Sequence, residues 1–189
     1  NFDADADAYL TFSKRLPNLW VIVPHLPAGL NKTQINTLLS NLVDKFLQNK
    51  DIEEFAFWYY TPMALEFTEQ HIPKLTIFDC MDELSAFKFA PEELKTLEKK
   101  LLEKADVVFT GGHSLYEAKK HQHTNIYPFP SSIEKSHFEK ARKAKTQPAD
   151  QAHIKGPKLG FYGVIDERVD INLIREIADA RPDWQIMLI

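Results

Sequence analysis

Short, continuous apolar runs alternate with amphipathic segments along this chain. Runs without a polar residue at every second position are typical of strands buried on both faces of a parallel sheet. We therefore predict an α/β fold, with helices between the strands and on both faces of the sheet. The expected strands span residues 19–23, 55–60, 74–78, 107–109, 125–127 and 159–163, with a last one from about 184.

Helical periodicity fills the gaps between these runs. Asn31 and Gln34 have the spacing of a capping box, at the start of a helix whose apolar residues recur from 35 to 47. Pro62 opens a short helix, and Pro91 opens a longer one. The apolar stripe of that longer helix consists of Leu94, Leu97, Leu101 and Leu102.

Composition narrows the class of protein. The 189 residues are 44% hydrophobic and 26% charged, which suits a folded chain rather than a disordered tail. The net charge of −4 argues against nucleic acid as the main partner. Cys80 is the single cysteine, and no apolar run reaches the ~18 residues of a membrane span, so we expect a cytoplasmic protein. The start at Asn1 and the apolar end at Ile189 suggest an excerpt of a longer chain.

The first candidate site follows the strand at 74–78. Open α/β sheets bind ligands at the carboxyl ends of their strands, and Asp79, Asp82 and Glu83 cluster at this end. A carboxylate there can accept a proton from an attacking hydroxyl or hold sugar hydroxyls. The alternative is structural, with Asp82 as the cap of a short helix and Glu83 in its first turn.

The second candidate site follows the strand at 107–109, where two glycines stand together. Gly112 allows a ligand to approach the backbone, and His113 and Ser114 follow at a helix start, where an anion is favoured. Ser114 has capping-box spacing to Glu117. The alternative is a tight turn with an exposed histidine. Neither a Gly-x-Gly-x-x-Gly motif nor a Walker loop is present, so dinucleotide and P-loop functions lose their main support.

The third candidate site follows the strand at 159–163. Gly163 permits close approach of a diphosphate, and Arg168 offers forked donors to its oxygens. The spacing equally favours a surface salt bridge among Asp166, Glu167 and Arg168.

The sequence gives little support for a metal site or a catalytic thiol. The closest histidines, His121 and His123, have no cysteine nearby and lack the spacing of a helical ligand pair, so we predict no metal site. The acidic alternation from Asp3 to Asp7 lacks the glycine and distal glutamate of a calcium loop, and we expect a solvated terminus there. Cys80 has no identifiable activating base, which favours a buried thiol.

The order of the motifs is more specific than any one of them. The segments are 79–87 (DCMDELSAF), 105–112 (ADVVFTGG), 114–119 (SLYEAK), 129–133 (FPSSI) and 160–168 (GFYGVIDER). Together they resemble bacterial group 1 (family 4-like) glycosyltransferases of the GT-B type, over residues from about 19 to 189. That resemblance implies two Rossmann-like domains with doubly wound parallel sheets.

The resemblance also implies a domain division. Residues 1–150 would be an acceptor-side domain that lacks its beginning, 151–157 a linker, and 158–189 the first β-α-β unit of a donor-binding domain. On this mapping Asp79 and Asp82 are catalytic candidates, and Gly163 and Arg168 approach the donor diphosphate. The residues expected to contact the substrate are Glu83, Gly112, His113 and Ser114. Many relatives have Lys-Gly where this chain has Val169-Asp170, which leaves a second phosphate contact without a counterpart.

The implied activity is transfer of a sugar from a nucleotide diphosphate-sugar donor to a saccharide or lipid-linked acceptor, in polysaccharide biosynthesis. No metal or other cofactor is expected, and this piece alone is expected to be inactive. Candidates for peripheral contact with an anionic membrane are Lys119, Lys120, Arg142, Lys143 and Lys145, although such residues more often form solvated helix faces.

Two other classes of function stay open. One is a non-catalytic sugar- or nucleotide-binding α/β module, and the other is a domain that serves protein assembly. The aromatic residues fall mainly in the expected strands, which favours a core role over a sugar-stacking platform.

Overall fold

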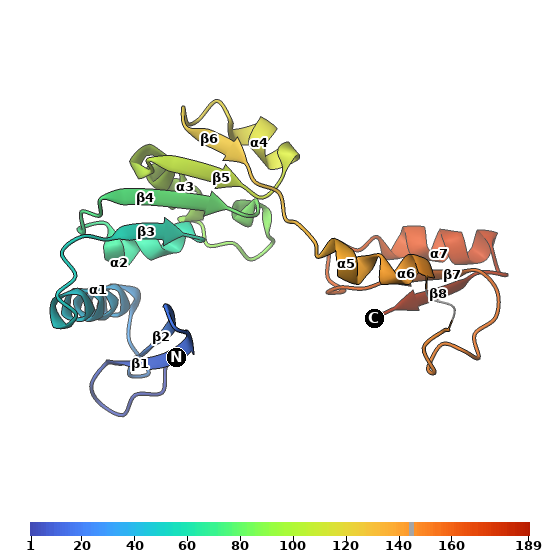
Figure 1. The fold of residues 1–189 in the computed structure, drawn as a ribbon, viewed down its shortest axis with the longest axis horizontal. Coiled ribbons are helices and arrows are strands. Elements are labelled where there is room, and N and C mark those ends of the chain that lie inside the picture. The colour runs from blue at the N-terminus through green and yellow to red at the C-terminus, as the bar shows by residue number, and fades with distance from the viewer. Residues whose placement is uncertain (144–145) are drawn as a thin grey trace. The chain divides into compact units, whose positions relative to one another are not determined.

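A computed structural model describes residues 1–143 and 146–189 (Figure 1). The chain divides into two compact units, Asn1–Ser132 and Ile133–Ile189. Lys145, one of the candidates for membrane contact, lies outside the described residues. The segment 151–157, which the resemblance assigns as a linker, lies within the second unit.

A β-hairpin begins the first unit. Strand β1 (Tyr9–Leu16) pairs antiparallel with β2 (Leu19–His25). The prediction of a strand near 19–23 is confirmed, but the prediction that it is buried in a parallel sheet is wrong. Most of its first half is exposed, because a two-stranded hairpin can bury at most one face against its neighbours. The strand continues two residues past the predicted end at residue 23, through Pro24 to His25.

Helix α1 (Lys32–Asn49) follows the hairpin and packs beside it. The predicted capping box is confirmed: the Asn31 side chain accepts from the Gln34 backbone N–H, and the Gln34 side chain accepts from the Asn31 backbone N–H. The rings of Phe12 and Phe46 stack with centroids 6.0 Å apart, which joins β1 to α1. An apolar cavity of about 400 Å³ lies between the hairpin, α1 and the first strand of the sheet described next.

The centre of the first unit is a four-stranded parallel sheet in the order β3-β4-β5-β6. Its strands are β3 (Ala56–Tyr59), β4 (Leu75–Cys80), β5 (Val107–Thr110) and β6 (Ile126–Pro128). The connections contain η1 (Pro62–Ala64), α2 (Leu65–Thr68), η2 (Leu84–Ala86), α3 (Leu94–Lys104) and α4 (His113–Lys119). The predicted leucine stripe of α3 is buried. The predicted α/β class and the parallel pairing are confirmed.

Helices cover one face of this sheet (Figure 1). Each strand follows its neighbour in chain order, and right-handed crossovers then place every connecting helix on the same side. The core on that side includes Leu65, Phe78, Leu101 and Val108. We predicted helices on both faces of the sheet, and within the described residues helices cover this face only. Helices on the second face would require the strand order to reverse.

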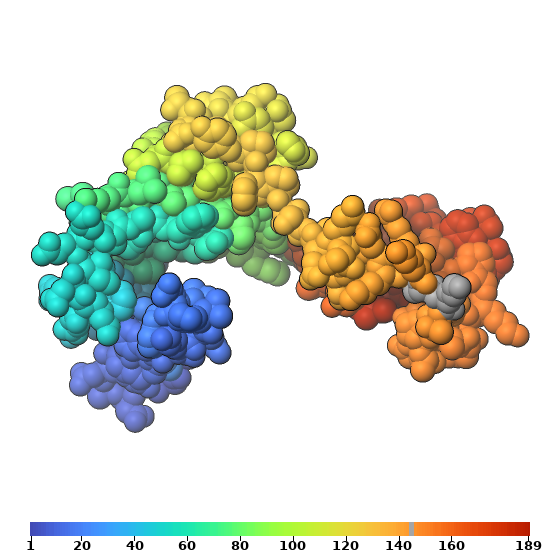
Figure 2. Space-filling model, viewed as in Figure 1, coloured from blue at the N-terminus to red at the C-terminus, as the bar shows by residue number. Residues whose placement is uncertain are grey.

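The opposite face of the sheet carries exposed aromatic side chains. Trp58, Tyr127 and Phe129 expose 52%, 53% and 69% of their surface. In the view of Figure 1 no helix of this unit lies in front of the four strands, and Figure 2 shows the same side as an open surface. The prediction that the strand aromatics serve mainly as core is therefore wrong for these three residues.

The second unit contains a β-α-β element. Strand β7 (Lys158–Phe161) pairs in parallel with β8 (Gln185–Leu188), and α7 (Ile171–Ala180) connects them. The Asp170 side chain caps α7 by accepting from the Leu173 N–H. Two short helices, α5 (Lys135–Phe138) and α6 (Lys140–Lys143), precede this element. No helix in the described part of the chain combines the length and apolar character needed to cross a bilayer.

Candidate functional site

The carboxyl ends of β4 and β5 bring two of the predicted sites together. Asp79 is in register with Phe109, and the Gly111 N–H donates to the Cys80 carbonyl oxygen at 2.9 Å. A Cβ atom on Gly111 would lie 2.2 Å from the carbonyl oxygen of Met81. The first glycine of the pair is therefore required by contact between two loops of this chain.

Asp79 lies half-buried at the end of β4. Its carboxylate accepts a hydrogen bond from Nε1 of Trp58 at 3.2 Å. The Trp58 ring in turn stacks on Phe109, with ring centroids 6.0 Å apart. No cation among the described residues pairs with this carboxylate, so its oxygens face the indole N–H and the open side of the sheet.

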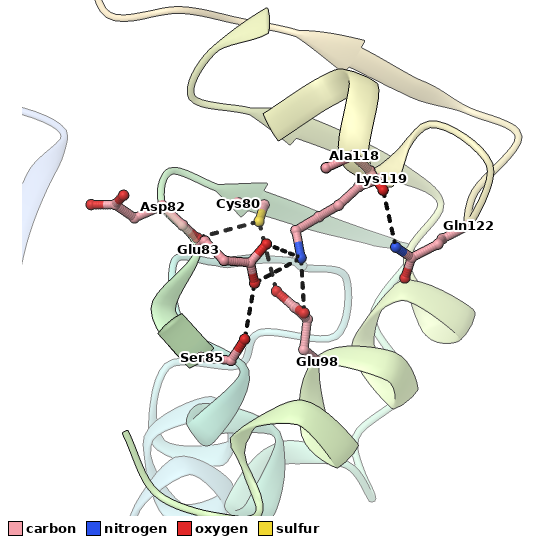
Figure 3. A network of polar contacts seen from close by, with 8 residues as sticks. All are labelled: Cys80, Asp82, Glu83, Ser85, Glu98, Ala118, Lys119 and Gln122. Carbon is pink, nitrogen blue, oxygen red and sulfur yellow. Dashed lines mark hydrogen bonds and ion pairs between the residues drawn. The ribbon is translucent and has the colours of Figure 1, made fainter. Parts of the chain in front are cut away.

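Glu83 is bound within the protein (Figure 3). Its carboxylate lies 3.0 Å from Nζ of Lys119 and accepts from the Ser85 hydroxyl, also at 3.0 Å. Asp82 is exposed, and its side chain points away from this cluster in Figure 3. The alternative that Asp82 caps a helix is wrong, because η2 begins at Leu84 and has no side-chain cap hydrogen bond.

Lys119 is the centre of that cluster. Only 4% of the residue is exposed, and Nζ lies 3.0 Å from a carboxylate oxygen of Glu98 on α3 as well as from Glu83. Burial alone would lower the pKa of Lys119, but the hydrogen bonds that its ammonium group donates to Glu83 and Glu98 outweigh this effect, and the pKa is raised. The expectation of a solvated or membrane-facing Lys119 is therefore wrong: two carboxylates hold its charge inside the protein.

The Cys80 thiol borders the same cluster. Its Sγ donates to the Asp82 carbonyl oxygen at 3.6 Å, and burial raises the pKa of the thiol to about 12. A thiol with this pKa stays protonated near neutral pH, where a nucleophile must be a thiolate. The prediction of a buried thiol is confirmed.

The second predicted site lies at the start of α4. The helix begins at His113 with Gly112 as its N-cap, so the capping box predicted for Ser114 is wrong. The cap position falls two residues earlier because the chain is still extended at Gly112, whose φ is −173°. His113 and Ser114 are exposed, and the space beside Gly112 is open. These residues adjoin the edge of the sheet at which Asp79 lies.

The third predicted site lies in the second unit. The Gly163 N–H donates to the Ile189 carbonyl oxygen at 3.1 Å. Nη2 of Arg168 lies 2.6 Å from a carboxylate oxygen of Asp166, and these hydrogen bonds lower the pKa of Asp166. The alternative of a salt bridge at this loop is confirmed for Asp166 and Arg168. A diphosphate at Arg168 would compete with that carboxylate.

Three of the histidines, His25, His71 and His123, make polar contacts within the protein. Nε2 of His71 lies 2.8 Å from a carboxylate oxygen of Asp44, and Nδ1 of His25 lies 2.7 Å from one of Asp3. His123 bonds the Ala105 carbonyl oxygen at 2.9 Å. Within the described residues, no group of three His, Cys, Asp or Glu side chains is placed to hold a metal ion.

Sequence reasoning missed the two contacts that organise this edge of the sheet. The bond from Trp58 to Asp79 spans 21 positions, and that from Lys119 to Glu98 also spans 21. One signal was available for the second: Glu98 stands four residues after Leu94, on the flank of the leucine stripe. A charge at such a position needs a partner when the helix packs.

We compared the chain with protein-family models and with curated proteins, and nothing matches it.

Proposed function

We propose that this chain belongs to a glycosyltransferase of the GT-B type, which transfers a sugar from a nucleotide diphosphate-sugar donor to a saccharide or lipid-linked acceptor. Asp79 carries the proposal. It lies at the carboxyl end of a parallel strand, where α/β sheets bind ligands, and it lacks a cationic partner among the described residues. Of the three predicted carboxylates, Glu83 is paired with Lys119, which leaves Asp79 and Asp82 for chemistry.

In this proposal Asp79 accepts the proton of the attacking acceptor hydroxyl. A carboxylate needs to lie within hydrogen-bond distance of that hydroxyl, and the bond from Trp58 Nε1 holds Asp79 in one orientation at the open edge. Glu83, tied to Lys119 and Ser85, positions the loop that carries Asp82. Gly112, His113 and Ser114 border the acceptor from the neighbouring loop.

The donor side of the proposal lies in the second unit. The loop after β7 carries Gly163 and Arg168, and Arg168 binds the donor diphosphate in place of Asp166. Under the same proposal, residues 1–150 belong to an acceptor-side Rossmann-like domain, and residues 158–189 begin a donor-binding domain. We also propose a cytoplasmic location, with peripheral membrane contact through the exposed basic residues Lys120, Arg142 and Lys143, and no metal or other cofactor.

Sugar transfer from a panel of nucleotide sugars, measured in the complete protein, tests this function. Asp79→Asn should lower turnover by at least about 100-fold, because general base catalysis contributes that much. Arg168→Ala should weaken donor binding. Unchanged turnover in both folded variants would remove the assignment. Residues 1–189 alone should not catalyse sugar transfer. A transfer rate equal to that of the complete protein would contradict the domain mapping.

A binding module without catalysis is the second candidate. It is favoured by the same exposed aromatic side chains and carboxylate, which can hold a sugar without moving a proton. Binding of a nucleotide sugar by the complete protein, with no transfer to any acceptor, would select it over the enzyme.

A further inference from the structure

The open face of the sheet carries a row of aromatic rings. We define the aromatic face as Trp58, Tyr60, Phe109, Tyr127 and Phe129. Trp58 stacks on Tyr60 and on Phe109, with centroids 6.4 and 6.0 Å apart, and Phe109 contacts Phe129 at 5.5 Å. Phe109 is also in register with Tyr127 on the adjacent strand, so both side chains lie on the same face.

A carboxylate lies within this row. Asp79 on β4 stands between Trp58 on β3 and Phe109 on β5, in register with Phe109. The indole N–H of Trp58 donates to one of its oxygens, Oδ2. An aromatic face with an anionic acceptor inside it differs from a plain apolar surface in what it can bind.

The carboxylate decides which class of ligand fits. An apolar protein surface laid over the aromatic face would bury Asp79 without a cation, which is costly. A pyranose ring offers both parts of the complement: C–H bonds on one side that pack against an aromatic ring, and hydroxyl groups at its edge that donate to a carboxylate. Ligand sites commonly combine aromatic walls with a few placed polar groups.

We propose that the aromatic face binds a saccharide, with a pyranose ring stacked on Trp58 and its hydroxyl groups donating to Asp79. This inference rests on the proposed function and names the part of the protein that holds the acceptor. Trp58 is then a specificity-determining residue, because an acceptor without a flat C–H face loses the stacking contact. Asp79 receives hydroxyl donors from the side of the carboxylate that the indole leaves open.

Saturation-transfer difference NMR on residues 1–189 tests the binding without any donor. The probes are the methyl glycosides of glucose, galactose and mannose, and sorbitol serves as an acyclic polyol control that has hydroxyl groups but no ring. We expect saturation of the ring C–H protons of at least one glycoside, concentrated on one face, and none of sorbitol. Trp58→Ala should weaken the binding by about tenfold, the loss of one stacking contact.

Trp20 provides the matched control. It exposes 51% of its surface against 52% for Trp58, but it lies on the hairpin strand β2. Trp20→Ala should leave glycoside binding unchanged, and Trp58→Phe should retain part of it because a ring remains. Equal binding by Trp58→Ala and Trp20→Ala, or no binding of any glycoside, would overturn the saccharide site. A concentration-dependent dimer that Trp58→Ala abolishes would also overturn it, in favour of a second copy on this face.

The outcomes separate this inference from the proposed function. Glycoside binding that depends on Trp58, without sugar transfer by the complete protein, keeps the saccharide site and rejects the transferase. Sugar transfer whose acceptor KM is unaffected by Trp58→Ala keeps the transferase and rejects the saccharide site.

Discussion

Nζ of Lys119 lies 3.0 Å from a carboxylate oxygen of Glu98, with 5% and 13% of the two side chains exposed. The pair joins α4 to α3, and Glu83 adds the loop that follows β4 (Figure 3). Desolvation of two charges offsets much of their attraction, so such a pair adds little net stability but is costly to break. These ion pairs therefore fix α3, α4 and the loop after β4 relative to one another on the helix side of the sheet.

Removing the ammonium group alone should be strongly destabilising. Lys119→Met leaves Glu98 buried without its cation, and we expect the free energy of unfolding to fall by about 3–5 kcal/mol. Urea denaturation measures this loss. Lys120→Met is the matched control, because Lys120 is exposed and pairs with Glu117 on the surface of the same helix, and it should leave the urea midpoint unchanged.

A double variant separates lost charge pairing from lost packing. Lys119→Met combined with Glu98→Gln removes the uncompensated carboxylate and should recover part of the stability lost by Lys119→Met. No recovery in the double variant, or equal effects of Lys119→Met and Lys120→Met, would contradict the buried pair.

Cys80 makes stability depend on alkaline pH. Burial raises the pKa of the thiol from 9.0 to about 12, so the folded protein keeps a proton that the unfolded chain releases above pH 9. Stability is fully present below pH 9 and falls as the pH rises toward 12, by at most about 1.4 kcal/mol per pH unit. Urea midpoints measured from pH 7 to 11 should show this slope.

The contribution of the Cys80 thiol is identified by the slope of stability against pH and not by the absolute stability. Cys80→Ala should move the onset of alkaline destabilisation upward, to the range where Tyr59 and Lys119 titrate. The pKa values of both are raised above their ordinary 10.0 and 10.5, so each also loses stability with rising pH. An identical dependence of stability on pH for Cys80→Ala and the unchanged protein would show that the pKa of the Cys80 thiol is not raised by folding.

The two adjacent glycines should respond oppositely to the same substitution. Gly111→Ser places Cβ against the carbonyl oxygen of Met81, and we expect a loss of about 1–3 kcal/mol in the free energy of unfolding. Gly112→Ser adds a side chain in open space at the N-cap of α4, where serine is a better cap than glycine. It should be neutral or slightly stabilising in the same urea assay.

The pair of variants also tests the site. Should Gly112→Ser destabilise as much as Gly111→Ser, the close approach of the two loops would not be the reason for the glycine pair. Binding of a methyl glycoside that Gly112→Ser abolishes while stability is unchanged would support contact of this loop with the saccharide.

Local features of the fold could be predicted from the sequence because their causes lie within one or two helical turns. Asn31 and Gln34 form their capping box, and the leucines of α3 are buried as their spacing indicates. The helix start at His113 rather than after Ser114 shows the limit of this reasoning. Either position satisfies the local rule, and the extended backbone at Gly112 decides between them.

Contacts between distant elements could not be predicted in the same way. The position of Glu98 beside the leucine stripe indicates that its charge needs a partner, but nothing in the sequence identifies that partner as Lys119, since the pair forms only when the folded chain brings α4 near α3. The openness of the aromatic face depends on the order of the strands, which hydrophobic pattern does not encode. Continuous apolar runs therefore predicted strands near the positions of β2 to β8, but they missed β1 and assigned both faces of the sheet to the core.

The capping box of α1 offers the clearest test of a locally determined feature. Asn31→Ala removes the acceptor for the Gln34 N–H, and we expect the free energy of unfolding to fall by about 1 kcal/mol. Asn41→Ala is the control, since Asn41 is exposed in the middle of the same helix, where alanine is the better helix former. That variant should be neutral or stabilising. Equal losses from both substitutions would mean that the amide of Asn31 contributes no more than any other asparagine of the helix, and urea midpoints at one pH decide between the two results.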